Sequence, residues 1–247
     1  MEVNMKWFNL DSPLMQGLSR MADILWLNVL TLIFCLPIVT AGASLTAMHY
    51  MSLKMARNEE SYISAGFFKA FKQNFKQATA IWFIELAALL VIVGDFYIMV
   101  ASENGIHIAI QVVIYIVTFL FLMTVTFVYP LLAKFENTVR QTIKNAFLIS
   151  IMQFPKTVLK IIMSAIPIAA FILFPQAIPL VLMFGLALPA YLFAKLYDKF
   201  FARYEEMVLA QNGGGETEEG EGEEEEDERI FKDELDPALA AMRDDEE

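Results

Sequence analysis

Long stretches almost free of charge recur along the chain up to Tyr204, and they constrain the fold more than any other feature. A helix needs about 20 apolar residues to cross the roughly 30 Å of bilayer hydrocarbon. Residues 78–101, 108–132, 158–174 and 178–196 have this character, and 57% of the whole chain is hydrophobic. Backbone groups inside lipid must bond to one another, which favours helices. The sequence therefore predicts an all-α, polytopic membrane helical bundle.

A broken apolar stretch at residues 18–56 predicts a membrane hairpin. Pro37 should end or bend the first helix, because proline removes a hydrogen-bond donor and clashes with the preceding turn. Gly42, at the other end of the predicted turn 37–42, can adopt the backbone angles that a tight chain reversal needs. The second limb, 44–56, makes only about 22 Å of helix. It can cross obliquely or re-enter, and both alternatives remain open. With this hairpin the total is about six transmembrane helices.

Two segments alternate apolar and basic residues at helical spacing and predict interfacial amphipathic helices. In the first, 63–75, five apolar positions oppose Lys69, Lys72 and Gln73, and Lys76 follows directly. In the second, 135–151, an apolar residue recurs every four positions opposite Arg140 and Lys144. We also expect kinks at Pro167 and Pro189, within the last two crossings.

Charge divides the chain into two predicted domains. Residues 1–204 contain 15 Lys+Arg and 10 Asp+Glu, whereas 205–247 contain 3 and 19. The net charge of −11 therefore comes from the tail. An almost unbroken acidic run at 216–228 cannot bury enough apolar surface to fold. We expect 1–204 to be the transmembrane domain and 205–247 to be an acidic, disordered cytoplasmic tail.

Basic residues also set the expected orientation, because those flanking crossings stay in the cytoplasm. All 15 basic residues up to Tyr204 fall in four segments, and the three links between those segments contain none. Six crossings with both termini cytoplasmic put every one of them on one face. Five crossings would leave Lys6 and Arg20 on the other face.

Polar residues at membrane depth are functional candidates because they are costly there. The candidates are Asn28, Thr40, His49, Glu85 and Asp95. Each also has a structural alternative: Asn28 can simply bond between helices, and His49 can be a packed polar residue. Glu85 is the strongest candidate for a proton or substrate role.

Motifs for common chemistry are missing from the sequence. There is no phosphate-binding glycine loop, nucleophile elbow or plausible carboxylate pair. Two histidines and the lone Cys35 do not make a metal-ligand cluster. We therefore expect no enzymatic activity, no cofactor or metal, and no nucleic-acid partner.

A family resemblance adds to these expectations. The residues that carry it are Phe8-Asn-Leu-Asp-Ser-Pro13, Asn28, Leu36-Pro37-Ile-Val-Thr40-Ala-Gly42, Ala47, Phe67-Phe-Lys-Ala-Phe71-Lys-Gln-Asn-Phe75-Lys-Gln-Ala78 and Trp82. They resemble the bacterial YesL family, an integral-membrane domain of unknown function whose members are typically encoded beside carbohydrate ABC transporters and polysaccharide-degrading enzymes. The resemblance implies a plasma-membrane location and a role linked to carbohydrate uptake. It supplies no catalytic or binding residues.

Two functions follow as alternatives. The first is an accessory or interaction protein whose partners are the lipid bilayer and carbohydrate ABC transporter subunits. The second is a small secondary transporter with a polar path around Glu85 and Asp95.

The orientation can be tested by cysteine-accessibility labelling at Asn104, Gln176 and Gln211. We expect the first two positions to be labelled from outside the cell and Gln211 only from the cytoplasm. Labelling of Gln211 from outside would overturn the orientation.

Overall fold

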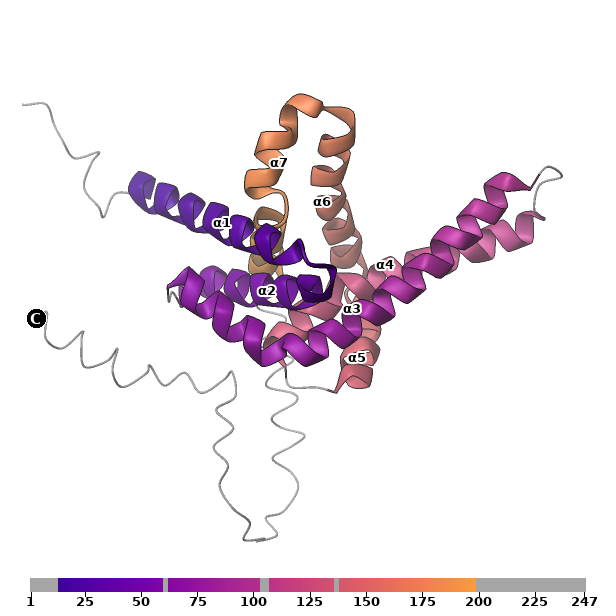
Figure 1. Cartoon of the computed structure of the whole chain (residues 1–247), viewed down its shortest axis with the longest axis horizontal. Coiled ribbons are helices and arrows are strands. Elements are labelled where there is room, and N and C mark those ends of the chain that lie inside the picture. The colour runs from indigo at the N-terminus through magenta and orange to yellow at the C-terminus, as the bar shows by residue number, and fades with distance from the viewer. Residues whose placement is uncertain (1–12, 60–61, 103–106, 136–137, 199–247) are drawn as a thin grey trace, which may run out of the picture. The chain divides into compact units, whose positions relative to one another are not determined.

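The chain divides into two units, Met1–Tyr204 and Glu205–Glu247. The computed structural model describes residues 13–59, 62–102, 107–135 and 138–198, all within the first unit, and they are all-α, as predicted (Figure 1). The predicted tail lies outside the described residues. In chain order the elements are α1 (Pro13–Cys35), η2 (Ile38–Thr40), α2 (Ala41–Arg57), α3 (Ile63–Ala101), α4 (Ile108–Lys134), α5 (Val139–Met152), α6 (Phe154–Leu173), η3 (Pro175–Ala177), α7 (Ile178–Phe184) and a last helix Ala187–Asp198.

The hairpin of α1 and α2 turns where the sequence predicts. Helix α1 ends at Cys35, two residues before Pro37. The hydroxyl of Thr40 holds the turn because its single O–H lies within hydrogen-bond reach of the carbonyl oxygens of Phe34 and Pro37, at O–O distances of 2.7 and 2.9 Å. At its far end, α2 stops at Asn58, which has a left-handed φ of 58°.

Gly42 does not form the reversal that we expected, because it lies inside α2. Its role is close approach between helices. A Cβ on Gly42 would lie 2.4 Å from the carbonyl oxygen of Ala78 and 2.7 Å from the Cβ of Trp82, both on α3. The absence of a side chain therefore lets α2 and α3 pack backbone to backbone.

The predicted boundary between an interfacial helix at 63–75 and a crossing at 78–101 is wrong. Both segments belong to the single helix α3, 39 residues and about 58 Å long. Its first half packs against protein: Phe67 is fully buried, and the rings of Phe67 and Phe71 lie 5.9 and 5.4 Å from that of Phe34 on α1. The lysines of this half remain on its exposed side.

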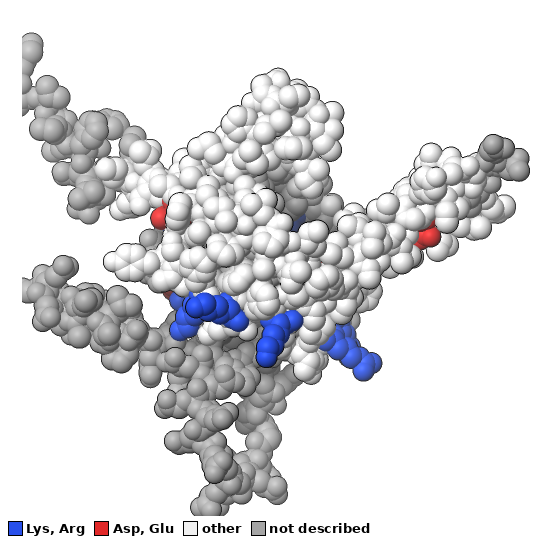
Figure 2. Space-filling model, viewed as in Figure 1, with Lys and Arg blue, Asp and Glu red and all other residues white. Residues whose placement is uncertain are grey.

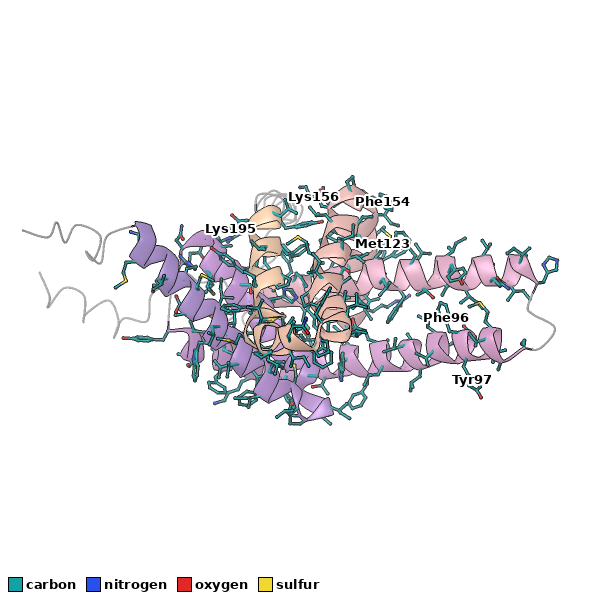
Figure 3. The ribbon with its side chains drawn as sticks, turned by 90° about the horizontal axis from the view of Figure 1, so that it is seen from above. Phe96, Tyr97, Met123, Phe154, Lys156 and Lys195 are labelled. Carbon is teal, nitrogen blue, oxygen red and sulfur yellow. The ribbon has the colours of Figure 1, made fainter. Side chains whose placement is uncertain are left out.

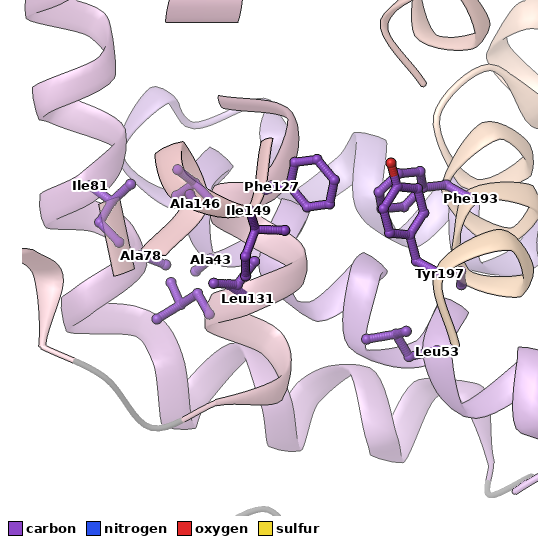
Figure 4. Packing of buried hydrophobic residues seen from close by; sticks show 13 residues of the cluster. Ala43, Leu53, Ala78, Ile81, Phe127, Leu131, Ala146, Ile149, Phe193 and Tyr197 are labelled. Carbon is purple, nitrogen blue, oxygen red and sulfur yellow. The ribbon is translucent and has the colours of Figure 1, made fainter. Parts of the chain in front are cut away.

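A helix forms within the segment predicted at 135–151, but α5 starts only at Val139, and its fully buried residues are not those of the predicted apolar stripe. A capping box between Thr138 and Gln141 starts it. Its buried positions include Ala146 and Ile149, which join the core (Figure 4). Phe147 and Ile151, from the predicted apolar stripe, are 36% and 48% exposed. These side chains are available to lipid rather than to the bundle.

Six crossings were expected, whereas four described helices are long and apolar enough to cross a membrane: α1, α3, α4 and α6. A fifth arises if Pro175–Phe184, which is η3 with α7, forms one span with Ala187–Asp198, to which it is bent by 52°. Helix α2, with 17 residues and a more polar sequence, does not qualify. The second half of α3 and the first half of α4 run side by side away from the other described helices (Figures 1 and 3), and the rings of Phe96 and Tyr115 meet there at 5.7 Å.

Gly42→Ala should destabilise the protein by about 1–3 kcal/mol, because the new methyl group collides with the backbone of α3. Gly94→Ala is the matched control, since its Cβ would meet nothing within 4 Å. The control should be neutral or stabilising by up to about 1 kcal/mol. Unfolding in detergent measures both, and equal stability of the two variants would contradict the close approach.

Candidate functional site

Asn28 binds the backbone of a distant segment. It is fully buried on α1. Its amide nitrogen donates to the carbonyl of Leu182 at 2.8 Å. Its oxygen accepts from the N–H groups of Leu186 and Ala187, at N–O distances of 2.9 and 2.8 Å. All three partners flank the break between α7 and the last helix, so the structural alternative for Asn28 accounts for its position.

The break itself follows from Pro189. A proline lacks the N–H that would bond the carbonyl four residues earlier, and its ring crowds that carbonyl. The chain interrupts the helix at Gly185–Leu186, so that Pro189 lies in the first turn of Ala187–Asp198, where a missing N–H costs nothing. The expected kink is thus displaced toward the N-terminus. Pro167, by contrast, lies inside an unbroken α6.

Lys160 bonds a backbone group that Pro130 leaves free, and the sequence analysis did not predict this role. Pro130 inside α4 leaves the carbonyl of Thr126, four residues earlier, without its helical donor. The ammonium of Lys160, buried on α6, donates to this carbonyl. It also lies 3.5 Å from the ring centroid of Phe193. The signal in the sequence was a proline within one apolar stretch and a lysine within another.

Glu85 pairs with Tyr129 across α3 and α4. The phenol of Tyr129 donates to Oε2 of Glu85, and both residues are buried. Within the described residues, Oε1 of Glu85 is buried with no hydrogen-bond partner, and so is Nε1 of Trp82, one turn earlier on α3. The buried pair of Glu85 and Tyr129 has the indole of Trp82 one turn away along α3, and one carboxyl oxygen of the pair accepts nothing from the described residues. This cluster is the candidate functional site.

The other predicted positions do not join this cluster. Thr40 caps the hairpin turn. His49 lies half-buried on α2, within electrostatic range of Lys160. Asp95 is half-buried on α3, about 15 Å along the axis from Glu85. It makes no hydrogen bond or ion pair with another described residue. Glu85 and Asp95 are therefore not linked by a chain of contacts.

No group of three or more His, Cys, Asp or Glu side chains that could hold a metal ion occurs within the part of the chain that the structure describes. The chemistry that the candidate site can perform is therefore proton binding at the carboxyl group and hydrogen bonding to a polar ligand.

A double-mutant cycle tests the role of Lys160. Lys160→Met should destabilise the protein by about 1–3 kcal/mol, because it strands the carbonyl of Thr126 in an apolar environment. In a Pro130→Ala background, the alanine N–H can bond that carbonyl, so the same substitution should cost about 1 kcal/mol less. Lys195→Met, at an exposed lysine, is the control. Equal costs of Lys160→Met in the two backgrounds would contradict the assignment.

Comparison with known proteins gives one family. Residues 22–96 match a protein-family model described as "Protein of unknown function, DUF624". No curated protein and no solved structure matches the chain. The matched segment covers about three tenths of the chain and contains all five polar positions singled out from the sequence. The hairpin of α1 and α2 and most of α3, with Glu85 and Trp82, therefore make up a segment similar to the DUF624 family, whose description gives no activity.

Proposed function

We propose that this chain is an accessory or interaction protein of the bacterial plasma membrane, without enzymatic activity, that acts beside a carbohydrate ABC transporter. The link to carbohydrate uptake is supported by the resemblance of the first 85 residues to the YesL family. The match of residues 22–96 to the DUF624 model supports the view that the same segment belongs to a family of proteins. The accessory role is supported by the engagement of polar side chains inside the bundle, which form hydrogen bonds to the protein's own backbone.

That engagement is the observation that carries the proposal. A sugar path needs several hydroxyl and amide groups facing one cavity. Here several such groups bond the protein's own backbone: Asn28 holds the break after α7, Thr31 donates to the carbonyl of Leu27, and Ser44 donates to that of Thr31. Groups committed in this way stabilise helix packing and are not free for a substrate.

In the topology that we propose, the chain crosses six times and both termini are cytoplasmic. Helix α2 is the short limb. It is buried along most of its length against α1, α3 and α4, so few of its polar groups meet lipid. A limb of about 25 Å can then return the chain to the cytoplasmic side, where Lys54 and Arg57 end it.

A second function, a small secondary transporter, is favoured by one specific observation. Oε1 of Glu85 has no hydrogen-bond partner among the described residues, so it gives the site an acceptor that packing does not explain. A buried carboxyl group in a membrane helix can bind and release a proton. The expected partner of Glu85 on such a path, Asp95, lies too far away to share a site with it.

One experiment separates the two functions. The full chain is purified in mild detergent with carbohydrate transporter subunits co-expressed, and it is also reconstituted alone in proteoliposomes for sugar uptake. We expect a stable complex and no uptake by the chain alone. Glu85→Gln, which keeps the shape but not the charge, should leave the complex intact. Tyr129→Phe is the matched variant at the partner of Glu85.

The opposite result is equally clear. Saturable uptake by the chain alone that is lost in Glu85→Gln would overturn the accessory role and establish the transporter. Failure to form a complex with any transporter subunit would remove the link to carbohydrate uptake.

A further inference from the structure

Exposed basic side chains gather on two neighbouring helices. They are Lys69, Lys72 and Lys76 on α3 and Arg140 and Lys144 on α5, and we call them the basic face. Helices α3 and α5 contact each other. In Figure 2 the lysine and arginine side chains in view lie along one margin of the described residues, and this margin is close to the first half of α3 and to α5 in Figure 1.

Within the described residues, no acidic side chain neutralises the basic face. Elsewhere on the described surface, Arg57 forms ion pairs with Glu59 and with Asp198. None of the five side chains of the basic face forms an ion pair with a described residue. Its charge is therefore directed outward.

Packing of the opposite side fixes this direction. Phe67, Ala70 and Asn74 of α3 are buried, and they alternate with the exposed lysines. Because α3 is anchored on α1 and α2 along this side, the lysines cannot turn inward. The same holds for α5, where Thr142 and Ala146 are buried and Arg140 and Lys144 are exposed.

The position of the basic face along α3 corresponds to the surface of a bilayer. After Lys76 the helix has no further basic residue up to Ala101. Lys69, Lys72 and Lys76 span two turns, about 10 Å, directly before this apolar stretch. Apolar side chains border the basic residues: Phe68 on α3 and Phe147 on α5 are each 36% exposed. Lysines beside exposed aromatic rings suit the boundary between headgroups and acyl chains.

We propose that the basic face binds the headgroups of anionic phospholipids in the leaflet next to the first half of α3. The phosphate of a headgroup accepts from the lysines while Phe68 and Phe147 enter the acyl boundary. The charge, the depth and the neighbouring aromatic rings all fit a leaflet. An acidic protein surface would match the charge alone.

The test measures retained lipid. The full chain is reconstituted in vesicles of equal parts phosphatidylglycerol and phosphatidylcholine and extracted in mild detergent, and the phospholipid that stays bound is quantified by mass spectrometry. We expect phosphatidylglycerol to be retained over phosphatidylcholine. The preference should weaken at about 1 M salt, where the Debye length is about 3 Å.

Three variants make the test specific. The triple variant Lys69→Gln/Lys72→Gln/Lys76→Gln should lower the ratio of retained phosphatidylglycerol to phosphatidylcholine by at least about fivefold. A fivefold change corresponds to about 1 kcal/mol, which is what a single lysine contributes near an anionic surface, so it is the minimum expected from removing three. Lys69→Arg/Lys72→Arg/Lys76→Arg keeps the charge and should keep the ratio. Lys195→Gln removes an exposed lysine outside the basic face and should also keep it.

The proposal is overturned by an unchanged ratio in the glutamine variant, or by an arginine variant that loses as much as the glutamine variant. Because all three lysines are exposed, the variants should unfold at the same temperature as the parent chain, and this comparison shows that the fold is intact. Equal retention of both lipids by the parent chain would also overturn it.

Discussion

A helix in lipid has no water to replace a missing backbone hydrogen bond, and the arrangement of this protein depends on how such gaps are filled. At two prolines among the described helices, side chains from other helices bond the backbone groups that the proline or the nearby break leaves free. Lys160 of α6 reaches the carbonyl that Pro130 leaves free in α4. Asn28 of α1 bonds three backbone groups at the break that precedes Pro189. Each repair also joins two helices that are distant in sequence.

Close packing holds the first part of the chain in a different way. The hairpin of α1 and α2 lies against α3 because Gly42 carries no side chain at the contact. The turn is fixed from both sides, since Thr79 of α3 donates to the carbonyl of Val39 at 3.2 Å. Because the two backbones are in direct contact there, few substitutions at the contact leave the packing intact. On the exposed surfaces of α3 and α4, by contrast, one apolar residue can replace another without a steric clash.

Local patterns in the sequence predicted what local physics determines. The all-α fold, the end of α1 before Pro37 and the helices at 108–132 and 158–174 all follow from apolar length and proline. The continuity of α3 was missed because a change of polarity near Lys76 was interpreted as a boundary. No proline or glycine lies between Phe67 and Val93, so the backbone had no reason to stop there. The partners of Glu85 and Lys160 could not be predicted, because pairing between helices is set by tertiary packing that periodicity does not encode.

The pair of Glu85 and Tyr129 differs from the other polar contacts inside the apolar helices. Asn28, Thr40 and Lys160 each bond a backbone group that a break or a turn leaves free, so folding alone explains them. Glu85 and Tyr129 bond each other, and no gap in α3 or α4 requires them. An apolar pair would fill the same space without the cost of burying a carboxyl group. A position that departs from what folding needs is where function is expected, and this argument selects Glu85 as the residue on which the second function, that of a small transporter, would depend.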